Sequence, residues 1–424
     1  MQIVRKLFLV LALLPALAAA GMAPAAAATR TQADPFVAEV LKLTNQYRAA
    51  NGLPPVVWNQ QIGNISQQWA EEQNRRITGG SFEMETIHRA GYGSTQLPAG
   101  WDWYTENIGI NNTARQVVDW WMGSPVHRKG MLSPYATDIG IGWMKTTDPA
   151  YYGMYVVVEN LAGYASTRAT LPEVDLSSIH EGDIAAVDAS GYLYVYPSAG
   201  GGDLWDRTYL SAGWKDAVQV EVADWNSDGV QDIVATRKNG TLVVSYGQKA
   251  GGLAPPRTVG SASWQGLEIE VTRWKRSDQY PGILATSVAD GKLYYYPNTN
   301  GSSYGARSQV GTGFKGLSTL ALDYDADGKM DLIARTKTGT GQLKLYRSNG
   351  SGKFISETRK IIRTSGWNKM VHLSSVSGHL GSGSLGILAA EKSGNLRYFP
   401  VTKNKVGSGI TIGRGGWETL RLGS

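Results

Sequence analysis

Asp331-Leu-Ile-Ala-Arg335 decides the fold of the second half of this chain, because the same short strand occurs five times. The other copies begin at Asp183, Asp232, Gly282 and Gly386, so the five starts are separated by 49, 50, 49 and 55 residues. A glycine turn and a second apolar strand follow each copy. Strand, glycine turn and strand is the pattern of a β-hairpin.

An aromatic residue after glycine or serine recurs with nearly the same period, at Trp214, Trp264, Phe314, Trp367 and Trp417. A unit of about 50 residues can hold four short strands, which is the content of one propeller blade. Residues 416–422 match the strand that precedes the other copies, and the first copy has no such strand before it. We therefore predict an all-β, five-bladed propeller over residues 179–424, in which the last strand completes the first blade. An open β-solenoid is the alternative.

Two of the copies are preceded by loops with oxygen-bearing side chains at positions one, three, five and nine and glycine at position six. These side chains are Asp224, Asn226, Asp228 and Asp232 in one loop, and Asp323, Asp325, Asp327 and Asp331 in the other. Position seven, Val230 or Lys329, would add a backbone carbonyl. Such a set can surround Ca²⁺, so we predict two calcium sites, with a solvated turn lacking an ion as the alternative.

These loops resemble the calcium-binding FG-GAP or VCBS propeller repeats, and the Leu-Tyr-x-Tyr-Pro strands resemble tachylectin-type five-bladed propellers. The resemblance implies that the calcium is structural and that the ring surface binds a ligand, often a glycan. Tyr196, Tyr296 and Phe399 are candidates to stack on sugar rings, and packing between blades is the alternative role for them.

Residues 34–163 follow a different pattern. Apolar residues at helical spacing predict helices beginning near Pro35, near Ile62 and at Thr113. Strands are expected over residues 139–143 and 151–158. Helices first and strands last favour an α/β sandwich.

His88, Glu106 and His127 are the candidate site residues of this part. Two imidazoles and one carboxylate can hold Zn²⁺ or another divalent ion, or act as a base and its electrostatic partner. None of the three lies within four residues of another, so spacing alone leaves a hydrogen-bonded polar groove as the alternative.

Four motifs resemble the bacterial branch of the CAP superfamily of cysteine-rich secretory, antigen five and pathogenesis-related proteins. They are Asn45-Gln-Tyr-Arg48, Leu53-Pro-Pro-Val-Val-Trp58, Glu106-Asn-Ile108 and Ser124-Pro-Val-His-Arg128. The resemblance implies an α-β-α sandwich whose cavity holds two His and two Glu. His88, Glu106 and His127 match three of these positions, and Ser124 stands where many members have the second Glu. The missing carboxylate weakens the case for a two-carboxylate mechanism but leaves room for a metal with three protein ligands and water.

The first 28 residues have the order of a secretory signal peptide: Arg5 and Lys6, an apolar run over 7–20, and small residues ending at Ala28. The apolar run is shorter than the about 20 residues that span a bilayer, so we expect no membrane span. We therefore assign 1–28 to a signal peptide, 34–163 to the CAP-like domain, 164–178 to a linker and 179–424 to the propeller. A net charge of +6 over 424 residues is too small to indicate a nucleic-acid-binding surface. The absence of cysteine excludes disulfides.

We expect a secreted binding protein, extracellular or associated with the cell wall. Its CAP-like groove would take a peptide or lipid, and its propeller would take a glycan or cell-wall polymer. The alternative is a metal-dependent hydrolase in which Glu106 activates water held by His88 and His127. Because the sequence contains no nucleophile elbow and no His-Glu-x-x-His helix, we favour binding over hydrolysis. A purely structural envelope protein is a third hypothesis.

Overall fold

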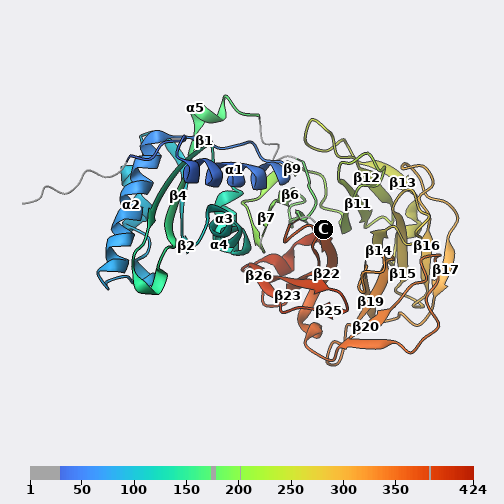
Figure 1. Ribbon diagram of the computed structural model, residues 1–424. Coiled ribbons are helices and arrows are strands. Elements are labelled where there is room, and N and C mark those ends of the chain that lie inside the picture. Colours follow the sequence, from blue (N-terminus) through green and yellow to red (C-terminus); the bar gives the residue numbers. More distant parts are fainter. Residues whose placement is uncertain (1–28, 173–177, 201, 382) are drawn as a thin grey trace, which may run out of the picture.

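The computed structural model describes residues 29–172, 178–200, 202–381 and 383–424 (Figure 1). The predicted signal peptide, residues 1–28, lies outside these ranges, as do residues 173–177 of the predicted linker. Within the described ranges, no helix has the length and apolar character needed to cross a membrane. The α-helices lie in the N-terminal part, and a β-rich region follows it beside them.

Nine helices and strands build the described N-terminal part, apart from short 3-10 turns. The helices are α1 (Pro35–Ala50), α2 (Gln60–Thr78), α3 (Ala114–Gly123), α4 (Pro125–Met131) and α5 (Ala165–Arg168). The strands are β1 (Val57–Trp58), β2 (Trp101–Asn111), β3 (Asp138–Lys145) and β4 (Tyr155–Tyr164). The strands form one sheet in the order β1-β3-β4-β2, in which only the β1–β3 pair is parallel.

Helices cover both faces of this sheet. Val157 of β4 packs in a core with α1, α3 and α4, whereas its neighbour Val158 packs on the other face with α2. This alternation is the side-chain period of a strand. The glycines of Ile139-Gly-Ile-Gly142 let α2 approach β3, because a Cβ at either glycine would lie 2.2 Å from the α2 backbone. The result is an α-β-α sandwich.

The three expected helices are confirmed as α1, α2 and α3, but the predicted order of elements was incomplete. Strand β2 precedes α3, and the short helix α4 carries His127. The second expected strand starts at Tyr155 rather than at residue 151, because Pro149–Tyr151 form a 3-10 turn capped by Asp148. Helix α5 falls within the predicted linker, and Arg168 at its end forms an ion pair with Asp102 at 2.7 Å.

The β-rich region contains five antiparallel sheets that follow the repeats. The first consists of β27 (Arg421–Gly423), β5 (Ile184–Val187), β6 (Leu193–Tyr196) and β9 (Thr208–Ser211). The second consists of β10 (Ala217–Ala223), β11 (Asp232–Arg237), β12 (Leu242–Ser245) and β13 (Arg257–Gly260). The third consists of β14 (Leu267–Thr272), β15 (Gly282–Ser287), β16 (Leu293–Tyr296) and β17 (Ser308–Gly311).

The fourth sheet consists of β18 (Leu317–Leu322), β19 (Asp331–Thr336), β20 (Leu343–Tyr346) and β21 (Lys360–Arg363). The fifth consists of β22 (Met370–Ser377), β23 (Leu385–Glu391), β24 (Leu396–Thr402), β25 (Lys405–Val406) and β26 (Ile410–Gly413). Strands β7 (Ser198–Gly200) and β8 (Asp203–Leu204) form a separate two-stranded sheet, and in the chain they lie between β6 and β9 of the first sheet.

The recurring aromatic residue joins each hairpin to the strand that follows it. All five rings are buried, and each backbone N–H donates to the carbonyl of the preceding turn glycine at 2.9 to 3.3 Å. The acceptors are Gly191, Gly240, Gly291, Gly341 and Gly394. The repeated glycine and the repeated aromatic are therefore two ends of one contact.

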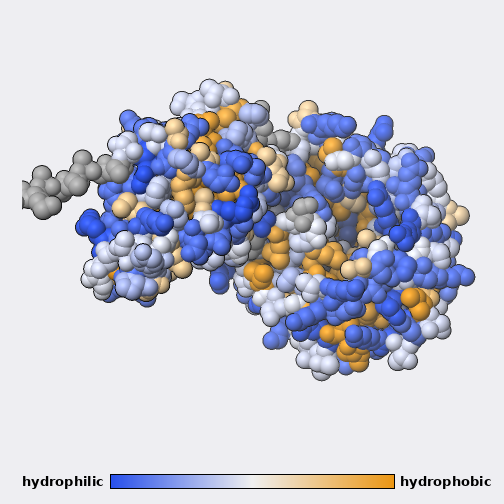
Figure 2. Space-filling view, in the orientation of Figure 1, coloured by the Kyte–Doolittle hydropathy of each residue, from blue (hydrophilic) through white to orange (hydrophobic). Residues whose placement is uncertain are grey.

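The inner strands of neighbouring sheets contact one another in the order β27, β10, β14, β18 and β22. Strand β27 pairs with β5, as predicted for the last strand, and the Ser424 hydroxyl donates to the Ser375 carbonyl of β22 at 3.0 Å. Residues of these inner strands line a cavity of about 450 Å³, and the surface in Figure 2 is hollowed near the middle of this region.

Candidate functional site

Strand β2 places Glu106 inside the N-terminal part, where its side chain is fully buried. Its Oε1 lies 3.0 Å from His88 Nδ1, and its Oε2 accepts a hydrogen bond from Arg89 at 3.5 Å. Arg89 also donates to the Ile65 carbonyl of α2 at 2.9 Å, which fixes the guanidinium. A buried carboxylate is tolerated only with such partners, so Glu106 is held by one cation and one imidazole.

His127 comes from α4. Its Nδ1 lies 2.8 Å from the Ser124 hydroxyl, and its ring centroid lies 4.9 Å from that of Trp120. Burial, with a smaller effect of the charge of His88, lowers the pKa of His127, so this imidazole is neutral near pH 7. Ser124 is therefore the hydrogen-bond partner of His127.

A buried carboxylate behind these residues was missed by the sequence analysis. Glu159 of β4 accepts hydrogen bonds from Thr44 at 3.0 Å and from Asn107 at 2.9 Å, and Asn107 also donates to the His127 carbonyl. Burial raises the pKa of Glu159 to about 7, against the opposing effect of its partners, including Arg48. The signal was a polar pair, Glu159 and Asn160, within an otherwise apolar strand.

The three predicted residues are brought together only in part. His88 and Glu106 touch, and the charge of His88 contributes, after burial, to the lowered pKa of His127. Across the described ranges, acidic and histidine groups converge in threes at Asp323, Asp325 and Asp327 and not at His88, Glu106 and His127. Each imidazole instead has an oxygen beside its Nδ1, which fixes the ring orientation.

The Asp323 loop folds around its first carboxylate. Asp323 accepts hydrogen bonds from the backbone of Asp327 at 3.0 Å and Gly328 at 2.9 Å, and Gly328 has a φ of 80°. Two oxygens, Asp325 Oδ1 and Asp331 Oδ2, are buried and have no hydrogen-bond partner among the described residues. Burial first, and then the neighbouring carboxylates, raise the pKa of Asp331 to about 7. This donor set fits a cation bound by oxygen.

The Asp224 loop has the same backbone frame with its acid groups more fully bonded. Asp224 accepts from the backbone of Asp228 at 2.9 Å and of Gly229 at 3.0 Å. Both oxygens of Asp232 accept backbone N–H groups, from Trp225 at 2.9 Å and Gly247 at 2.8 Å, and burial raises the pKa of Asp232 to about 6. The Asn226 amide donates to Asp228 at 2.9 Å.

In each loop, the backbone of the residue at position seven donates a hydrogen bond to the side chain at position five. The backbone N–H groups of Val230 and Lys329 donate to Asp228 at 2.9 Å and to Asp327 at 3.0 Å. The Lys329 ammonium also lies 2.6 Å from Asp327 Oδ2. This ammonium already partly neutralises the second loop.

The three aromatic residues considered for sugar stacking each contact a recurring aromatic residue that lies in the turn between two sheets. The ring centroids of Tyr196, Tyr296 and Phe399 lie 4.5, 4.7 and 4.5 Å from those of Trp417, Trp264 and Trp367. These contacts favour the packing role for them.

Residues 41–161 match the sequence model of the CAP family, described as the cysteine-rich secretory protein family. No curated protein matches this chain. Among solved structures, an outer surface protein of Borrelia burgdorferi is 14% identical, with a TM-score of 0.26, over 32% of this chain and 96% of that one. A lectin of Burkholderia pseudomallei is 14% identical, with a TM-score of 0.36, over 55% of this chain and 68% of its own. Protein AofleA of Arthrobotrys oligospora is 10% identical, with a TM-score of 0.30, over 59% of this chain and 90% of its own. The chain thus contains a domain that matches the CAP family over residues 41–161, followed by a β-rich region of separate antiparallel sheets.

Proposed function

We propose that this protein is secreted and acts as an extracellular or cell-wall-associated binding protein, with the CAP groove beside His127 as one binding site. The environment of Glu106 carries the preference for binding over hydrolysis. Its carboxylate is fully buried, and both oxygens are engaged by His88 and Arg89. A general base must reach the proton that it abstracts, so Glu106 orients His88 instead of activating water.

Two exposed side chains close to His127 in the chain support a ligand with an apolar portion. Trp120 is 49% exposed and Val126 is 81% exposed, and Trp120 packs against the His127 ring. Exposed apolar side chains beside a polar group are typical of a surface that binds a ligand. A peptide side chain or an acyl chain would cover Trp120 and Val126 while its polar end meets His127.

The second candidate function is metal-dependent hydrolysis, with His88 and His127 holding Zn²⁺ or another divalent ion. It is supported by the oxygen beside each Nδ1, from Glu106 and Ser124, since metal-binding histidines usually have such a partner. When bound, the ion would polarise a substrate carbonyl or lower the pKa of water. Glu106 would act as the partner of His88 and not as a metal ligand.

The two functions are separated with the full chain incubated with Zn²⁺. We expect a dansylated fatty acid or a labelled apolar peptide to bind, and Trp120→Ala plus Val126→Asp to weaken binding by about tenfold. Ester and peptide substrates should not be cleaved above the rate of His88→Ala plus His127→Ala. Met84→Ala, a 65% exposed apolar residue from another segment, is the control for binding. Zinc-dependent cleavage that His127→Ala abolishes would establish the hydrolase instead.

For the β-rich region, the proposal is a closed five-bladed propeller over residues 179–424, joined by a linker over 164–178 to the domain of 34–163. Closure is supported by the pairing of β27 with β5 and by the contacts of the inner strands. We assign structural Ca²⁺ first to the Asp323 loop, because of the two unbonded buried oxygens at Asp325 and Asp331, and second to the Asp224 loop. The propeller is proposed to bind glycan or cell-wall polymer.

A further inference from the structure

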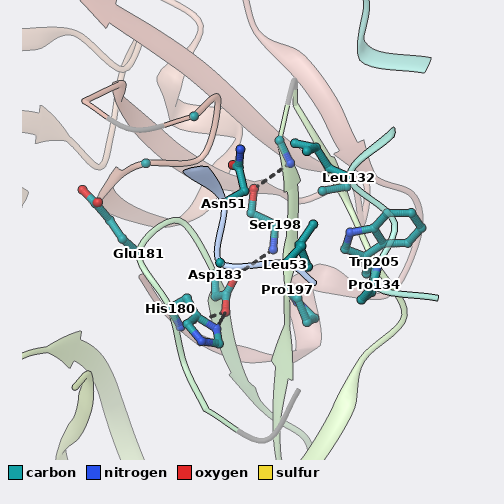
Figure 3. A pocket seen from close by; sticks show the side chains of 15 residues that line it. Asn51, Leu53, Leu132, Pro134, His180, Glu181, Asp183, Pro197, Ser198 and Trp205 are labelled. Atoms are coloured by element: carbon teal, nitrogen blue, oxygen red, sulfur yellow. Dashed lines mark hydrogen bonds and ion pairs between the residues drawn. The ribbon is translucent and has the colours of Figure 1, made fainter. Parts of the chain in front are cut away.

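A cavity of about 320 Å³ lies between the CAP domain and the β-rich region (Figure 3). The CAP domain contributes Asn51, Leu53, Leu132 and Pro134 to the lining of this cavity. The β-rich region contributes Glu181 and Trp205, among other residues. The volume is at the lower end for ligand pockets, which run from about 300 to 1,000 Å³, so only a small ligand group fits.

Helix α4 fixes one wall of this cavity. The Lys129 ammonium lies 2.9 Å from Asp203 Oδ2 and 5.2 Å from the Trp205 ring centroid, and Tyr135 meets the same ring edge-on. The Arg128 side chain lies against Gly200 so closely that a Cβ there would be 2.6 Å from its Nε. Trp205 is therefore held in place, and the cavity is already formed.

The opposite side of the cavity is polar. The Asp183 carboxylate accepts the backbone N–H groups of Ser198 at 2.7 Å and His180 at 2.9 Å, which fixes this loop. The exposed Glu181 carboxylate makes no hydrogen bond or ion pair within the described part of the chain. The Asn51 amide donates to the Tyr47 carbonyl, which leaves its oxygen to accept. The Glu181 carboxylate and the Asn51 amide oxygen can therefore accept hydrogen bonds from a ligand on this side.

An indole and aliphatic wall facing hydrogen-bond acceptors selects for a ligand with a flat C–H face and hydroxyl donors. A simple cation would gain little here, because a single exposed carboxylate binds weakly in water. A sugar ring uses both sides at once, since its C–H face covers an aromatic ring and its hydroxyls donate.

We propose that this cavity binds one or two sugar rings of a glycan, with the ring face on Trp205 and hydroxyls donating to Glu181 and Asn51. The inference rests on the proposed function as a binding protein, and it moves the sugar site away from Tyr196, Tyr296 and Phe399, whose rings pack against Trp417, Trp264 and Trp367. Because both parts of the chain form the walls, a bound sugar also links them.

The test titrates the full chain with soluble disaccharides, namely cellobiose, maltose and the disaccharide of N-acetylglucosamine, using saturation-transfer NMR and calorimetry. We expect at least one to bind, and Trp205→Ala to weaken it by about tenfold. Glu181→Ala plus Asn51→Ala should weaken it similarly without touching the Lys129 contacts. Tyr209→Ala, which removes a 53% exposed aromatic of β9, is the matched control and should bind as the parent does.

Two results would overturn the inference. If none of the disaccharides binds, the cavity is not a sugar site, while binding of acyl or peptide ligands beside Trp120 would still stand. If a disaccharide binds equally well to the Glu181 and Asn51 double variant and to Trp205→Ala, the protein binds sugar elsewhere.

Discussion

The first position of each repeated strand adopts one of two side-chain arrangements. Asp183, Asp232 and Asp331 use a carboxylate to accept backbone N–H groups, and the adjacent strand carries Val195, Val244 or Leu345 opposite the residue two positions after the aspartate. Gly282 and Gly386 leave that space to a tyrosine. A Cβ at Gly282 would lie 2.5 Å from the Tyr295 hydroxyl, and one at Gly386 would lie 2.3 Å from the Tyr398 ring. Tyr295 in turn donates to Asp278, which accepts the Lys275 N–H at 2.7 Å. Within one chain, aspartate thus occurs with an aliphatic partner and glycine with tyrosine.

This pairing predicts a coupled effect on stability. Gly282→Asp should lower the free energy of unfolding by about 1–3 kcal/mol, because the new side chain meets Tyr295 in a packed interior. Adding Tyr295→Val should recover part of the loss, with a coupling of about 0.5–3 kcal/mol between neighbouring sites. Urea unfolding of the two single variants and the double variant gives the coupling. Additive losses would show that the two positions are independent.

Among the elements, the acidic loops are predicted from the shortest stretches of sequence. Spacing alone predicted the eight side chains of the two loops, because such a turn is a local feature, and calcium binding by them stays a prediction. Spacing did not distinguish the two loops, since the bonding of Asp232 depends on Gly247 and that of Asp325 on Arg347, both outside the loops. Residue type and the resemblance to the CAP family selected His88, Glu106 and His127, but they did not indicate Asn107 and Glu159, which meet across two strands.

Helix periodicity predicted α1, α2 and α3, but it could not find β2 or α4. Strand β2 mixes polar residues with apolar ones, because Glu106 and Asn107 are buried by specific partners and not by apolar character. Helix α4 has only seven residues, which is too short for a periodic signal. Its seven residues nevertheless carry His127 at the groove and Lys129 at the contact with the β-rich region.

The Asp323 loop predicts how calcium and pH act together. The folded-state pKa of Asp331 is raised to about 7, above the about 3.9 of an unfolded aspartate. Between these values the folded chain holds a proton that the unfolded chain has lost, so without calcium stability falls as pH rises from about 4 to 7. Calcium binds the ionised carboxylates, so its stabilisation should be larger at pH 8 than at pH 5, reaching about 2.7 kcal/mol at about 100 times its Kd.

Melting curves in chelator and in calcium at both pH values check this. Asp323→Asn plus Asp325→Asn should remove the response to calcium. Asp290→Asn, at an exposed aspartate paired with Lys292, should keep it. Glu159 shares the pH trend but not the calcium response, so the difference between the two buffers is the informative quantity. Identical melts with and without calcium at pH 8 would leave the loop without an ion.

On the scale of the whole molecule, the Arg128 side chain of the CAP domain lies closely against Gly200 and Gly381 of the β-rich region. Gly200→Ala should therefore disturb this contact. Gly213→Ala is a matched control, because both glycines have positive φ, 69° and 92°, but a Cβ at Gly213 would meet nothing within 4 Å. Both changes carry backbone strain of about 1–2 kcal/mol, and only Gly200→Ala adds about 1–3 kcal/mol from crowding Arg128.

Thermal unfolding and small-angle scattering give the two measurements. We expect a lower melting temperature for Gly200→Ala than for Gly213→Ala, and a larger radius of gyration for Gly200→Ala alone. Equal values for the two variants would mean that Arg128 does not control the arrangement.

The pairing of β27 with β5 also determines the order in which the five sheets can form during folding. The second to fifth sheets are each built from contiguous sequence and can form as soon as their own segments are available. The first sheet cannot, since Arg421 donates to the Asp188 carbonyl across 233 residues of chain. Contacts this distant in sequence form slowly, and until then β5 presents an open edge that can pair with another chain. Assembly of this region therefore ends where it begins in sequence, and a chain interrupted shortly before residue 421 would remain prone to aggregation even with four sheets in place.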